Sequence, residues 1–263
     1  MRGLLDVRDV SVSFGAVAAL RDVSFSARPH EILGLIGPNG AGKTTMFNAL
    51  SGFVSATGSA LLDGVELIRV PSWKRPSLGL GRTFQTPRLL LGSNAVANVC
   101  QGMSELRAPS ILAQMLRTPR VRATQREAVM RANELLDSMG FPYRRDLPLS
   151  LLPFGAERFV EIARALALKP RVLLLDEPAA GLHVQERDLL REILRRLVDQ
   201  SLCDAVVLIE HDMSLVNEVC EHIVVLDGGE VLTNGCPADI QDDPRVIQAY
   251  LGVVPTDEEE IRV

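Results

Sequence analysis

Gly37-Pro38-Asn39-Gly40-Ala41-Gly42-Lys43-Thr44-Thr45 is the stretch that decides the fold of this chain. It follows the apolar run 32–36 and opens a segment whose apolar residues recur at helical spacing. Glycines allow backbone N–H groups to curl around an anion, and the N-terminus of the following helix adds its dipole. Lys43 can reach the β- and γ-phosphates, and the Thr44 hydroxyl can ligate Mg²⁺. Residues 37–45 are therefore the candidate binding loop for a nucleoside triphosphate.

The composition is that of an ordinary globular chain. Its 263 residues are enough for one large domain, or for a core with an insertion, and 47% hydrophobic content supports a substantial interior. The net charge of −5 argues against a general nucleic-acid binder. No apolar run approaches the roughly 18 residues needed to span a bilayer, and residues 1–20 lack a signal-peptide core. Any association with a membrane is therefore expected to run through partner proteins.

The four cysteines, Cys100, Cys203, Cys220 and Cys236, show neither Cys-x-x-Cys spacing nor a nearby histidine cluster suited to zinc. The absence of both patterns favours free thiols in a reducing compartment, which indicates the cytoplasm.

Two segments carry the signals of an antiparallel sheet. Residues 5–28 alternate apolar and polar side chains, with a turn at Gly15. Residues 58–68 contain the hairpin signal Asp63-Gly64, and they follow a first helix that is expected to end at Gly52. We expect both segments to join one sheet.

Three short apolar runs, 32–36, 172–175 and 205–209, have the character of buried parallel strands. Between the last two, residues 185–200 place apolar side chains on one face of a helix. This alternation predicts an α/β fold of the P-loop NTPase type with a doubly wound core, whose ligands bind at the carboxyl ends of the strands.

Residues 86–168 lose the strand signals, and 123–139 show helical spacing before Gly140, so an inserted α-helical subdomain is expected here. Residues 223–232, interrupted by Asp227-Gly228-Gly229, predict a hairpin. The expected organisation is a nucleotide-binding core with an antiparallel β subdomain from 1–84 and 169–255, a helical subdomain from 85–168, and a disordered acidic tail from 256–263.

Asp176 and Glu177 directly follow the apolar run 172–175 and carry two neighbouring carboxylates. A phosphate-transfer site needs such groups near its phosphate-binding loop. Asp176 can hold Mg²⁺ through water, and Glu177 can polarise the attacking water.

The ordered motifs resemble those of the ATP-binding subunits of ABC transporters, over nearly the whole length. They are the aromatic Phe14, the Walker A loop 37–45, the Q-loop Gly81-Arg82-Thr83-Phe84-Gln85, the signature region 152–158, Walker B at 172–177, the D-loop 179–183 and the switch histidine His211. The resemblance implies that Phe14 stacks on adenine and that His211 senses the γ-phosphate. It implies a catalytic set of Glu177, His211, Lys43 and Gln85, and Mg²⁺ held by Thr44, Gln85 and Asp176.

In that family two subunits face each other head to tail, and each ATP lies between one Walker A loop and the partner's Leu-Ser-Gly-Gly-Gln signature. This chain has Leu152-Pro153-Phe154-Gly155-Ala156, in which Pro153 offers neither a hydroxyl nor an N–H, although Gly155 can offer its backbone. Its D-loop, Ala180-Gly181-Leu182-His183, also departs from Ser-Ala-Leu-Asp. We hypothesise that the site this subunit completes on its partner is the weaker of two, and that its own site stays hydrolytic.

Several stretches resemble one branch, the ATP-binding subunits of hydrophobic (branched-chain) amino-acid importers: 37–48, 82–85, 176–182, 209–213, 234–237 and 246–252. Importers of urea or amides share much of this pattern and stay open as an alternative. The resemblance implies a second ATP-binding subunit, identical or different, two integral-membrane permeases and, indirectly, an extracytoplasmic solute-binding protein. It implies a peripheral place at the cytoplasmic face of the inner or plasma membrane.

Two other classes of protein fit less well. A soluble ABC-type ATPase that remodels nucleic acid or ribosomes would carry long coiled coils or a second phosphate-binding loop, which this sequence lacks. A kinase would leave the signature and His211 unexplained. No nucleic-acid partner is therefore expected.

Residues 86–118 hold more apolar side chains than a small helical insert needs, among them Leu89, Leu90 and Leu91. They predict either a groove for a cytoplasmic helix of a permease or the insert's own core. The branch usually has a bulky apolar residue and an acidic-Asn pair where this chain has Asn94-Ala-Val-Ala-Asn98.

Overall fold

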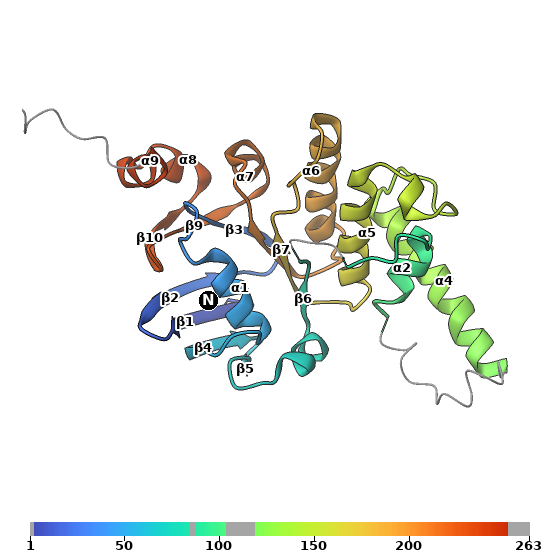
Figure 1. Cartoon of the computed structure of the whole chain (residues 1–263), viewed down its shortest axis with the longest axis horizontal. Coiled ribbons are helices and arrows are strands. Elements are labelled where there is room, and N and C mark those ends of the chain that lie inside the picture. Colours follow the sequence, from blue (N-terminus) through green and yellow to red (C-terminus); the bar gives the residue numbers. More distant parts are fainter. Residues whose placement is uncertain (1–2, 85–87, 104–118, 252–263) are drawn as a thin grey trace, which may run out of the picture.

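The computed structural model describes residues 3–84, 88–103 and 119–251, which form two β-sheets and a set of surrounding helices (Figure 1). The first sheet is antiparallel throughout and has the strand order β2-β1-β4-β5. Its strands are β1 Leu5–Phe14, β2 Val17–Ala27, β4 Thr57–Leu62 and β5 Val65–Glu66. The predicted antiparallel sheet is confirmed, with turns at Gly15 and at Asp63-Gly64.

The second sheet lies at the centre of the molecule and has the order β10-β9-β3-β8-β7-β6. Its strands are β3 Glu31–Ile36, β6 Leu80–Arg82, β7 Val172–Asp176, β8 Ala205–Ile209, β9 His222–Asp227 and β10 Glu230–Gly235. All neighbours are parallel except β9 and β10, which form the predicted hairpin. Sequence reasoning missed β6, because three residues that include a glycine show no detectable alternation.

Helices cover both faces of the central sheet, which confirms the doubly wound core. Alternate side chains of β3 point to opposite faces, so Leu33 packs with α1 Lys43–Ser51 and the antiparallel sheet. Ile32 packs with the core formed by α6 Val184–Asp199 and α7 Met213–Val219. Helix α1 ends at Gly52, whose φ of 78° gives the left-handed conformation expected for a helix C-cap.

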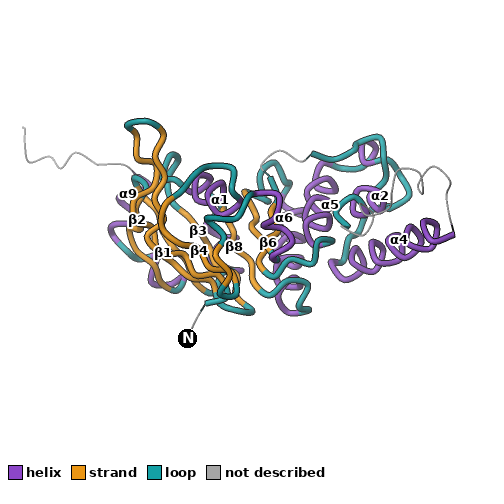
Figure 2. The backbone as a smooth tube through the Cα atoms, turned by 90° about the horizontal axis from the view of Figure 1, so that it is seen from below, coloured by secondary structure: helices purple, strands orange, loops and turns teal. Residues whose placement is uncertain are grey.

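A group of helices lies at the end of the molecule opposite the antiparallel sheet (Figures 1 and 2). These are α2 Ala95–Cys100, α4 Pro119–Met139 and α5 Phe154–Leu166. Helix α4 begins four residues before the predicted 123 and ends before Gly140, as predicted. Buried side chains of these helices, such as Leu136 and Phe159, belong to the same cluster as Leu173 of β7. The division at 84/85 and 168/169 stays a prediction.

Helices α8 Pro237–Gln241 and α9 Pro244–Leu251 follow β10 and pack beside it, and two 3-10 helices lie at Ser72–Leu78 and Leu149–Leu151. The predicted acidic tail, 256–263, lies outside the described residues. None of the helices in the described ranges combines the length and the apolar character that a bilayer crossing needs. All four cysteines are free thiols, and burial raises the pKa of Cys203 to about 12.

Candidate functional site

The phosphate-binding loop joins β3 to α1, and its backbone requires glycine at several positions. Gly37, Gly40 and Gly42 have φ values of 144°, 83° and 101°, which L-residues with a side chain rarely adopt. A Cβ on Gly37 would collide with the Leu226 carbonyl, and one on Gly42 would lie 2.6 Å from Leu20 Cδ2. The loop is therefore pressed against β9 on one side and β2 on the other.

Lys43 is the first residue of α1 and folds back over this loop. Its ammonium group donates to the carbonyl oxygens of Gly37, at 2.7 Å, and Pro38, at 3.0 Å. Burial lowers the pKa of Lys43, and the nearby carboxylates of Glu177 and Asp176 partly offset that shift. Because the N-cap residue Gly42 has no side chain to cap α1, the first-turn N–H groups at Thr44 and Thr45 are suited to an anion.

Asp176 ends β7 and is held by Arg82 and Thr83, which lie three and two positions before the predicted Q-loop glutamine. The Arg82 guanidinium donates to Asp176 Oδ2 at 3.1 Å, and both side chains are buried. Thr83 Oγ1 accepts the Asp176 N–H at 3.3 Å. Burial raises the pKa of Asp176, and the positive charge of Arg82 opposes the rise. The carboxylate is thus fixed in place by a buried ion pair.

Arg82 also joins Asp176 to the helix that carries Lys43. It donates to Asn48 Oδ1 at 2.9 Å and to Ser51 Oγ at 3.2 Å, both on α1. Its guanidinium lies 5.1 Å from the centre of the Phe84 ring. Sequence reasoning quoted Arg82 but gave it no role. No local signal in the sequence identifies its buried acidic partner, because Asp176 lies 94 positions away.

Glu177 and His211 lie at the carboxyl ends of the neighbouring strands β7 and β8. His211 Nε2 is 2.9 Å from Glu177 Oε1, and the Glu177 N–H donates to the Ile209 carbonyl at 2.9 Å. Glu177 has a φ of 50°, a conformation rarely adopted by non-glycine residues. The predicted catalytic pair is therefore brought into hydrogen-bond distance.

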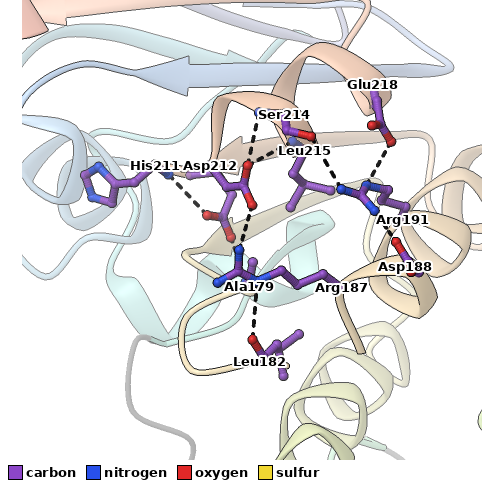
Figure 3. A network of polar contacts seen from close by, with 11 residues as sticks. Ala179, Leu182, Arg187, Asp188, Arg191, His211, Asp212, Ser214, Leu215 and Glu218 are labelled. Carbon is purple, nitrogen blue, oxygen red and sulfur yellow. Dashed lines mark hydrogen bonds and ion pairs between the residues drawn. The ribbon is translucent and has the colours of Figure 1, made fainter. Parts of the chain in front are cut away.

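Figure 3 shows a polar network that joins the predicted D-loop, residues 179–183, to His211. The buried carboxylate of Glu210 accepts the Ala179 N–H at 2.7 Å and the His211 N–H at 3.1 Å, and burial raises its pKa. Arg187 of α6 donates to the Leu182 carbonyl at 3.3 Å and to Asp212 at 3.0 Å. Sequence reasoning missed Glu210 and Arg187, because their partners become apparent only in the fold.

The signature segment begins α5, with Pro153 in the N-cap position as its helix-compatible geometry predicts. The Gly155 N–H donates to Glu186 Oε1 at 3.2 Å, and a Cβ on Gly181 would lie 2.9 Å from the Phe154 ring. Signature and D-loop are thus neighbours within the chain. The resemblance implied that the Gly155 N–H could donate to a nucleotide bound by the partner subunit. In this structure the same N–H donates to Glu186.

The other predicted site residues are placed as follows. Phe14 is 54% exposed at the end of β1, and Asn39, Gly40 and Thr44 are exposed on the loop and on the first turn of α1, whereas Ala41 is buried. Ala180 and His183 lie on the D-loop, and His183 is the N-cap residue of α6. Ala156 is buried in the first turn of α5. Gln85 lies outside the described residues.

The assembled groups suit phosphoryl transfer to water. A glycine loop, a helix N-terminus and an ammonium group supply positive potential for a polyphosphate. Beside them, Asp176 has oxygen atoms suited to Mg²⁺, and the Glu177 carboxylate, 2.9 Å from His211, is a group that can accept a proton. These elements match the recurring parts of an ATPase site.

Two known families match parts of the chain. The family described as ABC transporter matches residues 20–180. The family described as Branched-chain amino acid ATP-binding cassette transporter matches residues 230–254, which include β10, α8 and α9.

Individual proteins resemble nearly the whole chain. The high-affinity branched-chain amino acid transport ATP-binding protein BraF of Pseudomonas aeruginosa is 39% identical over 252 residues, which cover 95% of this chain and 98% of BraF. The protein of the same description named LivG, from Escherichia coli K12, is 38% identical over 250 residues, with 95% and 98% covered. The solved ADP conformation of MJ1267, an ATP-binding cassette of an ABC transporter, has a TM-score of 0.80 at 26% identity and covers 96% of this chain and 100% of MJ1267.

Proposed function

The chain belongs to the ABC transporter family of ATP-binding subunits, and from this premise we propose that it powers the import of branched-chain or other hydrophobic amino acids. Members of this family bind and hydrolyse ATP, and so does this chain. The observation that carries the proposal is the meeting of Lys43, Asp176, Glu177 and His211 at one edge of the sheet. The amino-acid cargo is supported by the names of BraF and LivG and by the match over residues 230–254.

Within this site we assign the triphosphate to residues 37–45 and the adenine ring to the exposed Phe14. Thr44 and Asp176, with Gln85, would hold Mg²⁺, and the hydroxyl and carboxylate oxygens are the hard ligands that this ion prefers. When bound, Mg²⁺ neutralises phosphate charge.

The chain's own residues then have separate tasks. Lys43 leaves the carbonyls of Gly37 and Pro38 for the phosphate oxygens, and Glu177 accepts a proton from the attacking water. His211 holds the Glu177 carboxylate in position through the 2.9 Å contact.

We propose that two such subunits, identical or different, enclose ATP at a head-to-tail interface. They act on two membrane permeases from the cytoplasmic face of the inner or plasma membrane. An extracytoplasmic solute-binding protein delivers the solute to these permeases and is thus an indirect partner of the chain. ATP can drive closure of the subunit pair only by binding the closed state more tightly than the open one, and hydrolysis removes that preference.

The surface next to the Q-loop supports a permease contact. Leu90 and Leu91 are 55% and 45% exposed, whereas Leu89 packs against the core. The buried Asn98 fixes this segment, because its amide donates to the Leu90 carbonyl at 3.1 Å and its Oδ1 accepts the Leu90 N–H at 2.8 Å. The other apolar residues of this region, at 111–116, lie outside the described part of the chain. We infer that the exposed leucines form part of the groove for a permease helix.

Transport measurements test the proposed cargo. The chain, purified in complex with its two permeases and the second ATP-binding subunit, is expected to support ATP-dependent uptake of labelled leucine into proteoliposomes that contain the solute-binding protein. Uptake of urea or short amides without leucine uptake would contradict the amino-acid cargo and support the alternative, an importer of urea or amides. Hydrolysis without uptake of any of these solutes would contradict both assignments.

Pro153→Ser is expected to raise the ATPase rate of the assembled complex, by up to about tenfold, since one hydrogen bond to a charged phosphate is worth roughly 1.5 kcal/mol. Serine restores both the hydroxyl and the N–H that Pro153 lacks at the start of α5. Pro153→Ala, which restores only the N–H, is the matched control and should give a smaller gain. An unchanged rate in Pro153→Ser would show that the signature does not limit hydrolysis.

A further inference from the structure

Gly37, the first residue of the phosphate-binding loop, is held from outside the loop by the C-terminal helix. The Tyr250 hydroxyl of α9 accepts the Gly37 N–H at 2.9 Å, although the two residues are 213 positions apart. Gly37 is buried, so its N–H needs an acceptor. Tyr250 lies in the stretch 246–252 that resembles the importer branch, and that resemblance gives it no role.

The same glycine carries the Lys43 contact on its other side. Its carbonyl accepts the Lys43 ammonium at 2.7 Å, while its N–H donates to Tyr250. These groups belong to the two peptide planes that meet at the Gly37 Cα. Glycine at a φ of 144° has few conformational restraints of its own, so these two hydrogen bonds and the adjacent Leu226 carbonyl restrain it.

Helix α9 is itself firmly seated, which makes it a suitable support. Val246 on α9 and Ile240 on α8 are buried in the core beside the central sheet. Arg245 at the start of α9 donates to Thr233 Oγ1 of β10 at 3.0 Å and pairs with Asp243 at 2.7 Å. Tyr250 is 37% exposed, and its partial burial raises its pKa, so the phenol stays neutral at physiological pH.

We propose that Tyr250 is a positioning residue for the nucleotide: its hydroxyl fixes the Gly37 peptide, and through it the loop and Lys43, in a conformation ready to receive phosphates. This inference rests on the proposed function, because it takes residues 37–45 as the nucleotide-binding loop. The proposal gives helix α9 a role at the ATP site. A loop that is already held in its binding conformation loses less conformational entropy when the nucleotide binds, so the affinity is higher.

Tyr250→Phe tests the proposal, because it removes only the hydroxyl and keeps the ring. The isolated full chain carrying this change is expected to bind MgADP about 3- to 10-fold more weakly in isothermal titration calorimetry, since the buried Gly37 N–H loses its acceptor. The melting temperature should fall by only a few degrees, the cost of one unsatisfied buried N–H. Hydrogen exchange at residues 37–43 should become faster, while exchange in β1 and β2 should stay the same. Gln248→Ala, at an exposed position on the same helix, is the matched control and should bind MgADP normally.

Equal or tighter MgADP binding by Tyr250→Phe would overturn the proposal, and so would an equal loss in Gln248→Ala. Tyr250→Ala adds the loss of the ring and should weaken binding at least as much, but the phenylalanine variant decides the question if the alanine variant does not fold. Normal MgADP binding together with normal ATP hydrolysis in a Lys43→Ala variant would instead remove the assignment of the loop, and this inference with it.

Discussion

Glu177→Gln is expected to slow ATP hydrolysis by about 10²- to 10⁴-fold and to leave nucleotide binding nearly unchanged. Glutamine has the shape of glutamate but cannot accept a proton from water at neutral pH. The backbone N–H of residue 177 keeps its bond to the Ile209 carbonyl, and the side-chain oxygen can still contact His211, so the site's geometry should survive. Single-turnover hydrolysis of labelled ATP measures the rate, and MgADP titration measures the binding.

The matched control is Glu192→Gln, which makes the same chemical change on an exposed side chain of α6. This variant should hydrolyse ATP at the unchanged rate. If Glu177→Gln retains hydrolysis within about tenfold of the unchanged protein, the general-base contribution expected of this carboxylate is absent. If it loses MgADP binding as well, Glu177 contributes to the shape of the site rather than to proton transfer.

The sequence is sufficient to predict the elements around these residues because each has a local signal. The apolar runs that became β3, β7 and β8 are buried on both faces, so no polar residue interrupts them. The turns at Gly15 and Asp63-Gly64 and the helix end at Gly52 require left-handed backbone. Glycine and aspartate adopt this conformation more readily than most residues, so these residue types predict the turns. The strand β6 has neither signal, and its position is determined only by pairing with β7.

The contacts within the site could not be predicted from the sequence, because they join residues that are far apart in it. Arg82 meets Asp176 across 94 positions, and Tyr250 meets Gly37 across 213. Residue type alone does not specify such pairs, since many arginines and tyrosines could satisfy the same chemistry. Local sequence thus predicts the members of the site, and the order of the parallel strands decides how they support one another.

Lys43→Ala is expected to weaken MgADP binding and to slow ATP hydrolysis, the two properties that Glu177→Gln separates. The Lys43 ammonium is held in a buried position by two loop carbonyls, and Asp176 and Glu177 lie close enough to oppose the lowering of its pKa. Without this charge, a polyphosphate would enter beside two carboxylates with its repulsion uncompensated. We expect MgADP affinity to fall by at least about tenfold and hydrolysis by more than about 10³-fold, because the ammonium contributes to both ground state and transition state.

Calorimetry and single-turnover hydrolysis on Lys43→Ala give these two values, with Lys74→Ala as the matched control on an exposed lysine. The control should leave both values unchanged. A large loss of hydrolysis with intact MgADP affinity would mean that Lys43 acts only on the γ-phosphate, and that the loop amides alone hold the rest of the nucleotide. Intact affinity and intact hydrolysis together would contradict the assignment of residues 37–45, because no other lysine lies on that loop or on α1.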